Sequence, residues 1–280
     1  MKKLIMWITS ALMALALLSV PAYLGAQNSE LTGDPLFQKF LEARKAGDKK
    51  AAIEYLQKGV DLGSPAAQAQ MGEEYRMGNL VPVDYKKAYE LTKLSVDQGW
   101  ARGMTDMGVL YMKGRGVEKN YEEAMKWFLK ATEKGDRKAI RYVGINYEYG
   151  YGTAIDYKKA EEYYRKASET GDGDITGECL LGSLYERGLG IEQNYDLAND
   201  WYMKSSARGD IIASPGMVAL GNLYETRKDG KQNLQTAIQW YRKAADLGNA
   251  EAKASLERLT GSNPELSGAG KDLCLTIFTK

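Results

Sequence analysis

The sequence predicts an all-α fold of the solenoid type, in which helix-turn-helix repeats stack one after another. A glycine returns at spacings of 36, 36, 38 and 39 residues, and we name these five positions the repeat glycines: Gly72, Gly108, Gly144, Gly182 and Gly221. Each is followed three residues later by a tyrosine and sixteen residues later by an alanine. A fixed period of this length, in five registered copies, is typical of proteins whose repeats pack on their neighbours.

The N-terminal residues have the pattern of a secretory signal peptide. Lys2 and Lys3 precede a mostly apolar stretch over residues 4–20, which Pro21 and small residues follow. This order is typical of a cleaved export signal. We therefore predict a signal peptide over residues 1–26, a polar linker over residues 27–33 and a periplasmic or secreted location in a bacterium. An uncleaved membrane anchor is the alternative, because about 17 mostly apolar residues approach the length that spans a bilayer.

The chain after the linker divides into a cap, five repeats and a second cap. Asp34 suits the N-cap of a first helix, and residues 34–62 have the pattern of an incomplete leading helix pair. Five full repeats are expected over residues 63–248, each with a first helix that carries the repeat glycine, a loop and a second helix. A capping helix over residues 249–260 follows. Residues 261–280 form a tail that either covers the last helix or binds a partner.

The apolar residues of each second helix fall on one helical face. In the second repeat they are three or four residues apart or adjacent, as on one side of an α-helix: Tyr121, Ala124, Trp127, Phe128 and Ala131. This face is expected to pack on the neighbouring repeats. A glycine inside a helix costs about 1 kcal/mol relative to alanine. Its return in five first helices therefore predicts that a bulky group, such as an aromatic ring of the adjacent helix, lies against it.

The loops follow the same repetition. Glycine pairs, as in Gly114-Arg-Gly116, follow the first helices and suit left-handed helix ends. An aspartate or asparagine precedes each second helix as a predicted N-cap, namely Asp84, Asn120, Asp156, Asn194 and Asn233. The fifth repeat departs from the pattern, because its loop reads Arg227-Lys-Asp-Gly230 and the turn before its first helix is longer, with Ser214 and Pro215 at the new helix start.

Composition excludes several classes of function. Lys and Arg number 38 and Asp and Glu 37, a balance that provides no strong positive field for nucleic acid. The chain contains no histidine, which excludes Ser-His-Asp and Cys-His catalysis and histidine ligands for zinc. The phosphate-binding motif G-x-x-x-x-G-K-[ST] and the acyl-transfer motif S-x-x-K are also absent. We therefore predict no catalytic residue, no cofactor and no metal site.

The two cysteines allow two interpretations. Cys179 falls on a first helix, three residues before Gly182, at a position where Ala69 and Thr105 stand in other copies. This favours a small, packed thiol. A disulfide with Cys274 is the alternative, since an exported chain can hold one.

The repeated pattern resembles the Sel1-like repeat family, whose members are related to tetratricopeptide repeats. It is carried by Leu-Gly-x-x-Tyr, Gly-x-Gly-Val, Asn/Asp-Tyr-x-x-Ala-x-x-Trp and Lys-Ala-x-x-x-Gly-Asp over about residues 34–260. The resemblance implies a right-handed α/α superhelix and a non-catalytic scaffold that binds a protein or peptide partner. A subgroup with a cysteine pair in every repeat is associated with penicillin-related activity, a pattern that this chain lacks. A hydrolase acting on cell-wall material or β-lactams is the alternative, and self-association is a third possibility.

The resemblance also implies where a partner would bind. In tetratricopeptide arrays the first helices line a concave groove, and registering this chain on its repeat glycines transfers that expectation to positions that vary between copies. The predicted groove residues are Glu73, Arg76, Arg102, Val109, Met112, Arg141, Ile145, Glu148, Tyr149, Glu186, Asn222 and Glu225. The identity of the partner is left open, and neither nucleic acid nor a membrane-inserted state after signal cleavage is expected.

Overall fold

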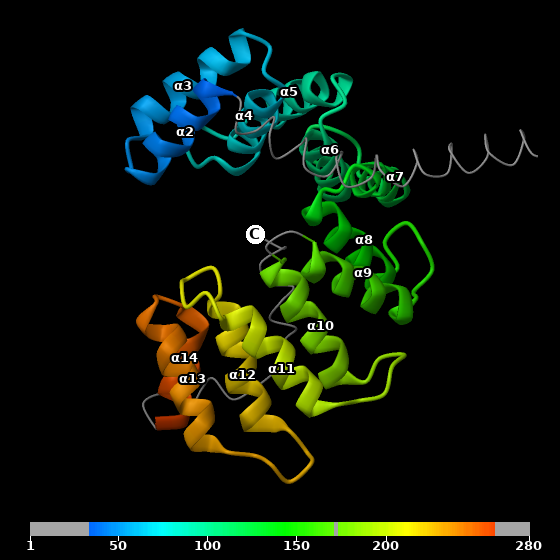
Figure 1. Cartoon of the computed structure of the whole chain (residues 1–280), viewed down its shortest axis with the longest axis vertical. Coiled ribbons are helices and arrows are strands. Elements are labelled where there is room, and N and C mark those ends of the chain that lie inside the picture. Colours follow the sequence, from blue (N-terminus) through cyan, green and yellow to red (C-terminus); the bar gives the residue numbers. More distant parts are fainter. Residues whose placement is uncertain (1–33, 171–172, 261–280) are drawn as a thin grey trace, which may run out of the picture. The chain divides into compact units, whose positions relative to one another are not determined.

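The computed structural model describes residues 34–170 and 173–260 of the chain. This part contains thirteen α-helices and no strand, and consecutive helices pack as pairs (Figure 1). The chain forms two compact units, Met1–Asp136 and Arg137–Lys280, which we call unit 1 and unit 2 and describe separately. The predicted signal peptide and linker, the tail and Cys274 all lie outside the described residues.

Unit 1 contains the leading helix pair and the first two full repeats. A core centred on Phe40, Leu56 and Met71 joins the leading pair to the next helix, and each of these side chains is at most 2% exposed. The helices are α2 (Pro35–Lys45), α3 (Lys49–Asp61), α4 (Pro65–Met77), α5 (Tyr85–Asp97), α6 (Ala101–Lys113) and α7 (Tyr121–Glu133).

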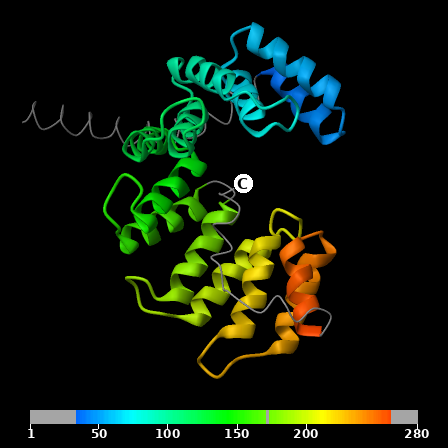
Figure 2. The same ribbon diagram turned by 180° about the vertical axis from the view of Figure 1, so that it is seen from behind.

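Unit 2 contains three further repeats and a final single helix. Its last helices share a core around Val218, Tyr241 and Ala252, all fully buried. The same helix pairs are visible from behind in Figure 2. The helices are α8 (Arg137–Tyr149), α9 (Tyr157–Glu169), α10 (Ile175–Arg187), α11 (Tyr195–Ser206), α12 (Ser214–Thr226), α13 (Leu234–Asp246) and α14 (Ala250–Thr260).

The predicted N-caps are confirmed at all five second helices. In each case the side-chain oxygen accepts a hydrogen bond from a backbone N–H in the first turn, as at Asn120, which accepts from Glu123 at 2.8 Å. The same bond is made by Asp84, Asp156, Asn194 and Asn233. Asp34 caps the leading helix in the same way. These bonds satisfy backbone donors that have no partner inside the helix.

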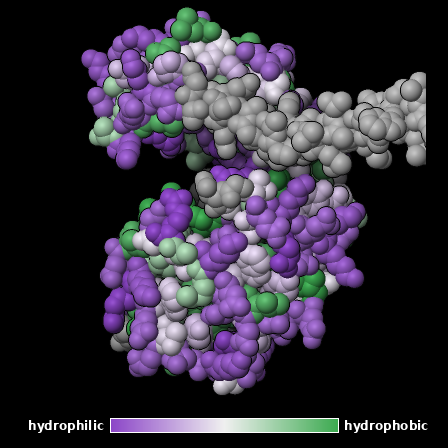
Figure 3. All heavy atoms as spheres, viewed as in Figure 1, coloured by the Kyte–Doolittle hydropathy of each residue, from purple (hydrophilic) through white to green (hydrophobic). Residues whose placement is uncertain are grey.

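The close approach predicted at the repeat glycines is also confirmed. A Cβ atom added to Gly144 would lie 2.6 Å from the ring of Tyr164 on the adjacent second helix. Phe128, Tyr202 and Tyr241 stand against the other repeat glycines in the same way, whereas Gly72 faces the smaller Thr92. The absence of a side chain on the first helix thus makes room for a ring from the second. The face of the molecule in Figure 3 is mostly hydrophilic in both units, with apolar residues in isolated patches.

No helix in residues 34–170 or 173–260 is both long enough and apolar enough to cross a membrane.

Candidate functional site

The surface of the first helices is the candidate site, and its residues are divided between the two units. Unit 1 contributes α4 and α6, and unit 2 contributes α8, α10 and α12. We therefore describe the predicted groove residues in two groups, each within its own unit.

Three apolar groove residues are buried, which corrects the sequence-based expectation for them. Val109 and Ile145 are each 2% exposed, and Met112 is 7% exposed. The helix α6 packs against α4, α5 and α7, so an apolar side chain on it gains free energy by leaving water. These three residues present almost no surface to a partner.

Three glutamates in unit 2 occupy the position four residues after the repeat glycine. Glu148, Glu186 and Glu225 each accept a hydrogen bond from the tyrosine that covers the glycine of their own repeat. The donors are Tyr164, Tyr202 and Tyr241, at 2.7, 2.6 and 2.9 Å respectively. Each tyrosine therefore fills the space above a glycine with its ring and fixes a carboxylate with its hydroxyl.

Two of these glutamates also link one repeat to the next. Arg187 donates to Glu148 at 2.7 Å, and Arg258 donates two bonds to Glu225, each at 2.6 Å. Burial would raise the pKa of Glu225, but the bonds from Arg258 and Tyr241 outweigh it, so this pKa lies below its ordinary value. The hydroxyl of Tyr241 also donates to Asn222. The glutamates at this predicted groove position are therefore paired with other side chains of the repeat array.

Arg141 likewise makes an internal contact. It is 9% exposed, and its Nη1 donates to the carboxylate of Asp174, the residue that caps α10. Thr105, at the same position of the preceding repeat, donates to Asp136 at 2.8 Å. The position three residues before a repeat glycine therefore connects a first helix to the start of the next repeat.

Tyr149 is the predicted groove residue of unit 2 with the largest aromatic side chain. It is partly buried and stacks on Tyr151, with ring centroids 5.8 Å apart and planes inclined by 20°.

The first-helix surface of unit 1 carries a cationic cluster instead. Arg76 stands at the position that unit 2 fills with glutamates, and its Nη2 lies 3.2 Å from Glu73. Nη1 of Arg76 faces the thioether sulfur of Met77 at 3.1 Å, and its buried Nε has no hydrogen-bond partner among the described residues. Arg102, 41% exposed, lies 3.7 Å from the same glutamate.

Lys113 extends this cluster along α6. Burial lowers the pKa of Lys113, and the nearby Arg115, Lys119 and Arg76 lower it further. The three neighbouring cations add to the effect of burial on this pKa, so positive charge gathers around Lys113. We call Arg76, Arg102 and Lys113 the cationic cluster of unit 1.

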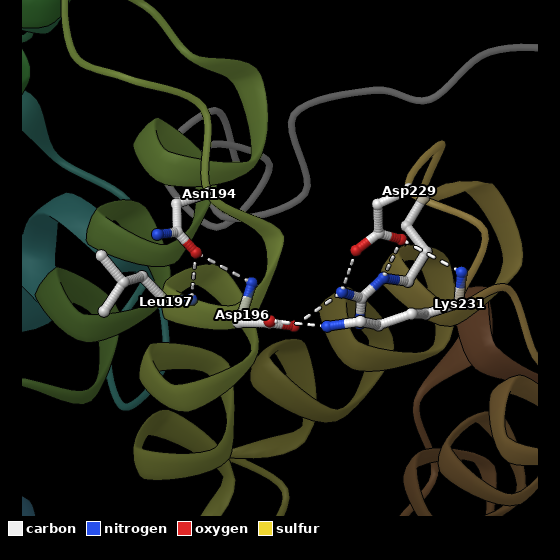
Figure 4. A network of polar contacts seen from close by, with 6 residues as sticks. Asn194, Asp196, Leu197, Asp229 and Lys231 are labelled. Carbon is white, nitrogen blue, oxygen red and sulfur yellow. Dashed lines mark hydrogen bonds and ion pairs between the residues drawn. The ribbon is translucent and has the colours of Figure 1, made fainter.

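A second polar network, which the sequence did not predict, lies in the loop of the fifth repeat. Arg227 is 3% exposed and donates to Asp196 at 2.7 Å and to Asp229 at 2.5 and 2.8 Å. Lys231 approaches the same Asp196 at 2.7 Å, and Figure 4 shows Asp196, in the first turn of α11, close to Asp229 and Lys231 of the fifth-repeat loop. The sequence signal for this network is Arg227 itself, which stands where the other repeats have a loop glycine.

The described residues include no group of three or more acidic or cysteine side chains placed to hold a metal ion. Cys179 is 1% exposed and is disulfide-bonded rather than a packed free thiol, which corrects the interpretation that the sequence favoured.

Comparison with known proteins gives one family and several solved structures. The family model for the Sel1 repeat matches six segments: residues 42–64, 65–100, 101–136, 137–172, 176–210 and 214–249. A Sel1 repeat protein from Oxalobacter formigenes is 28% identical, with a TM-score of 0.64, over 82% of this chain and 94% of that one.

Two other structures are more distant. A protective antigen present in uropathogenic Escherichia coli strains, which displays this repeat fold, is 26% identical over 91% of this chain and 63% of that one, with a TM-score of 0.51. An immunity protein from Pseudomonas aeruginosa shares the fold at 22% identity and a TM-score of 0.56, over 82% of this chain and 89% of that one. None of the curated proteins matches the sequence.

Proposed function

The chain belongs to the Sel1 repeat family, and from this premise we propose that it is a non-catalytic scaffold that binds a protein or peptide partner on its first helices. A solenoid offers its partner an extended surface, because each repeat contacts only its neighbours and leaves one face of its helices open. The repeat glycines stay constant between copies, while exposed first-helix residues such as Arg102 change, which suits such a role.

The cationic cluster of unit 1 is the part of this surface that we assign to the partner. The supporting observation is the change of charge four residues after the repeat glycine, where Arg76 replaces the glutamate of unit 2 and keeps an unpaired Nε among the described residues. Guanidinium groups bind carboxylates through short, charge-assisted hydrogen bonds. An acidic segment of a protein partner therefore fits Arg102 and Lys113, the two members of the cluster that reach the surface, whereas Arg76 is only 9% exposed.

The glutamates of unit 2 are less suited to this role. Glu148 and Glu225 each bind a tyrosine hydroxyl and an arginine from the next repeat. A partner would have to break these contacts, and a charged group that loses its buried partner costs several kcal/mol by order of magnitude.

The proposal includes export, with removal of residues 1–26 and function in the periplasm or outside a bacterial cell. The positive and apolar pattern of residues 2–20 supports it, and so does the bacterial source of the solved relatives. N-terminal sequencing of the protein from the envelope fraction tests this part, because an intact Met1 would contradict cleavage.

Affinity capture from the envelope fraction of the source bacterium tests partner binding. We compare the wild-type chain with the double variant Arg102→Glu/Lys113→Glu. Loss of two charge-assisted contacts, each worth about 1.5–3 kcal/mol, predicts at least about a tenfold weaker capture of an acidic partner. Raising the salt concentration should also weaken the wild-type complex, because salt screens the attraction between the opposite charges.

The matched control is Lys50→Glu/Lys86→Glu, which makes the same charge change at exposed second-helix positions of unit 1. The control is expected to capture the partner as well as wild type does. If both variants captured the partner equally weakly, the loss would be due to net charge rather than to the cluster. If neither variant captured it less well than wild type, the cluster would not be part of the interface. Turnover of a β-lactam or a peptidoglycan fragment by the purified chain would favour the hydrolase alternative.

A further inference from the structure

The contact between Arg76 and Met77, at the end of α4 in unit 1, is not used by the proposed function. Met77 is 42% exposed, whereas Arg76 is 9% exposed. Nη1 of Arg76 lies 3.1 Å from the thioether sulfur of Met77. We infer that Met77 is a site of oxidation by peroxides, and that Arg76 binds the oxygen of the methionine sulfoxide that forms.

Arg76 is a buried guanidinium with hydrogen-bond donors to spare. Among the described residues its bonds go to Glu73, at 3.2 Å, and to the sulfur of Met77. Its buried Nε has no partner there. A thioether is a weak acceptor, so the site offers this buried charge fewer good acceptors than such groups usually have.

The first repeat leaves Arg76 in this state because it lacks the aromatic ring of the later repeats. In unit 2 the residue four positions after the repeat glycine binds the hydroxyl of a tyrosine, as Glu148 binds Tyr164. In the first repeat Arg76 takes that position, and the short Thr92 stands in place of the tyrosine. The guanidinium is therefore bound only by side chains of its own helix.

Exposure distinguishes Met77 from the other described methionines of unit 1. A peroxide in solution reaches an exposed thioether without any opening of the fold. The side chains of the others are at most 8% exposed, namely Met71, Met104, Met107, Met112 and Met125. In unit 2, Met203 is 44% exposed, and its sulfur receives no hydrogen bond from the described residues. Met203 is therefore a matched reference for Met77.

The reaction needs only hydrogen peroxide as the oxidant. A lone pair of the sulfur attacks one peroxide oxygen, the O–O bond breaks, and the second oxygen leaves as water after taking the proton of the first. The sulfur loses two electrons and the peroxide gains them. The product is a polar sulfoxide, whose oxygen is a stronger acceptor than the thioether. Because methionine has a flexible, unbranched side chain, this oxygen can turn towards Nη1 and Nε of Arg76.

Peptide mapping by mass spectrometry after treatment of the full chain with hydrogen peroxide tests the site. Met71 is the control, because it lies on the same helix and is 2% exposed. A buried methionine reacts only when the fold opens, so we expect Met77 to gain an oxygen atom at least about tenfold faster than Met71. Equal rates at the two methionines would overturn the inference.

The melting temperature of the oxidised chain tests binding of the sulfoxide oxygen. Wild type and Met77→Leu are treated with peroxide together, so that oxidation of every other methionine affects both chains. A new charge-assisted hydrogen bond should raise the melting temperature of the wild type by about 2–4 °C relative to that of Met77→Leu. Treated Met203→Leu should keep this rise. A fall, or no difference between wild type and Met77→Leu, would show that Arg76 does not bind the oxygen.

A glutamine at position 77 tests the same contact without peroxide, since its amide oxygen is also a strong acceptor. Glutamine and leucine have similar helix propensities, so the comparison of Met77→Gln with Met77→Leu reports the acceptor. We expect Met77→Gln to melt about 2–4 °C higher, whereas Met203→Gln and Met203→Leu should agree within about 1 °C. An equal difference in both pairs would contradict a role for Arg76. None of these measurements requires a partner, so their outcome is independent of the proposed function.

Discussion

The loops of the fourth and fifth repeats are held against the preceding repeat by different interactions. In the fourth, Gly188 ends α10 in the left-handed conformation, and Gly190 brings the backbone against Tyr157 at the start of α9. In the fifth, Arg227 ends α12 in an extended conformation, and its guanidinium reaches Asp196 at the start of α11. Each loop is thus fixed to the second helix of the preceding repeat.

Because the two loops are held by different interactions, they should respond differently to mutation, pH and salt. The fourth loop depends on the absence of a side chain, so it tolerates pH and salt but no added atom. The fifth depends on charge, and the ring of Tyr195 lies 5.6 Å from the guanidinium as an additional contact. A repeat that departs from its consensus is therefore not a weakened copy, because another interaction takes over.

The largest loss of unfolding free energy is expected when a methyl group is added to the loop of the fourth repeat. Gly190→Ala places a non-glycine residue at φ +65, with its Cβ 2.7 Å from Tyr157. Left-handed strain of about 1–2 kcal/mol and a similar cost for moving the tyrosine predict a loss of roughly 2–4 kcal/mol in unfolding free energy.

Gly230→Ala in the fifth loop is the matched control, since Gly230 also has a positive φ, +80, but nothing within 4 Å of an added Cβ. Urea unfolding should show only the strain, about 1–2 kcal/mol. Equal losses at the two glycines would contradict the close approach at Gly190.

The second effect concerns the charge contact of the fifth loop. Arg227→Ala removes a buried guanidinium that serves two carboxylates, and we expect a loss of about 1–3 kcal/mol in urea unfolding. Arg208→Ala, which removes an arginine that is 55% exposed from its pair with Asp210, should change stability little. If both substitutions changed the unfolding free energy equally little, the contact of Arg227 would not stabilise the fifth loop.

The third prediction uses pH to separate the two loops. The hydrogen bond from Arg227 lowers the pKa of Asp229 to about 2, from an ordinary value of 3.8, and bonds from Lys231 and Arg227 lower the pKa of Asp196. Below pH 4 the unfolded chain therefore binds protons before the folded one does, and this stabilisation is lost as the pH falls towards 2.

The difference in melting temperature between wild type and Arg227→Ala should then shrink between pH 4 and about 2. In contrast, the difference between wild type and Gly190→Ala should change little over this range. A constant offset for Arg227→Ala would mean that its packing, not its charge, holds the loop.

The smallest effect is expected at the exposed side of the network. Lys231 is 59% exposed and its partner Asp196 is 66% exposed, so the pair is well screened by solvent. Lys231→Ala should shift the melting temperature by no more than about 1 °C. A larger shift in differential scanning calorimetry would show that the lysine positions Asp196 for Arg227.

The fold was largely predictable because its determinants are local or periodic. The repeat glycines with their rings and the N-cap residues follow from spacing along one chain. The groove was less predictable, since the exposure of Val109, Met112 and Ile145 depends on packing between repeats. The pairing of Arg141 with Asp174 depends on a residue 33 positions away, and no local pattern marks such a partner.

The contact between a tyrosine hydroxyl and a glutamate has a consequence for any attempt to exchange repeats. Three copies combine tyrosine with glutamate, whereas the copy with Phe128 has Met112 and the copy with Thr92 has Arg76. A phenylalanine has no hydroxyl to donate to a carboxylate. The residue that covers the repeat glycine and the residue four positions after that glycine therefore change together. Engineers who recombine or lengthen the array should transplant both residues together, because a chimera that mixes them would leave the glutamate without its hydroxyl donor.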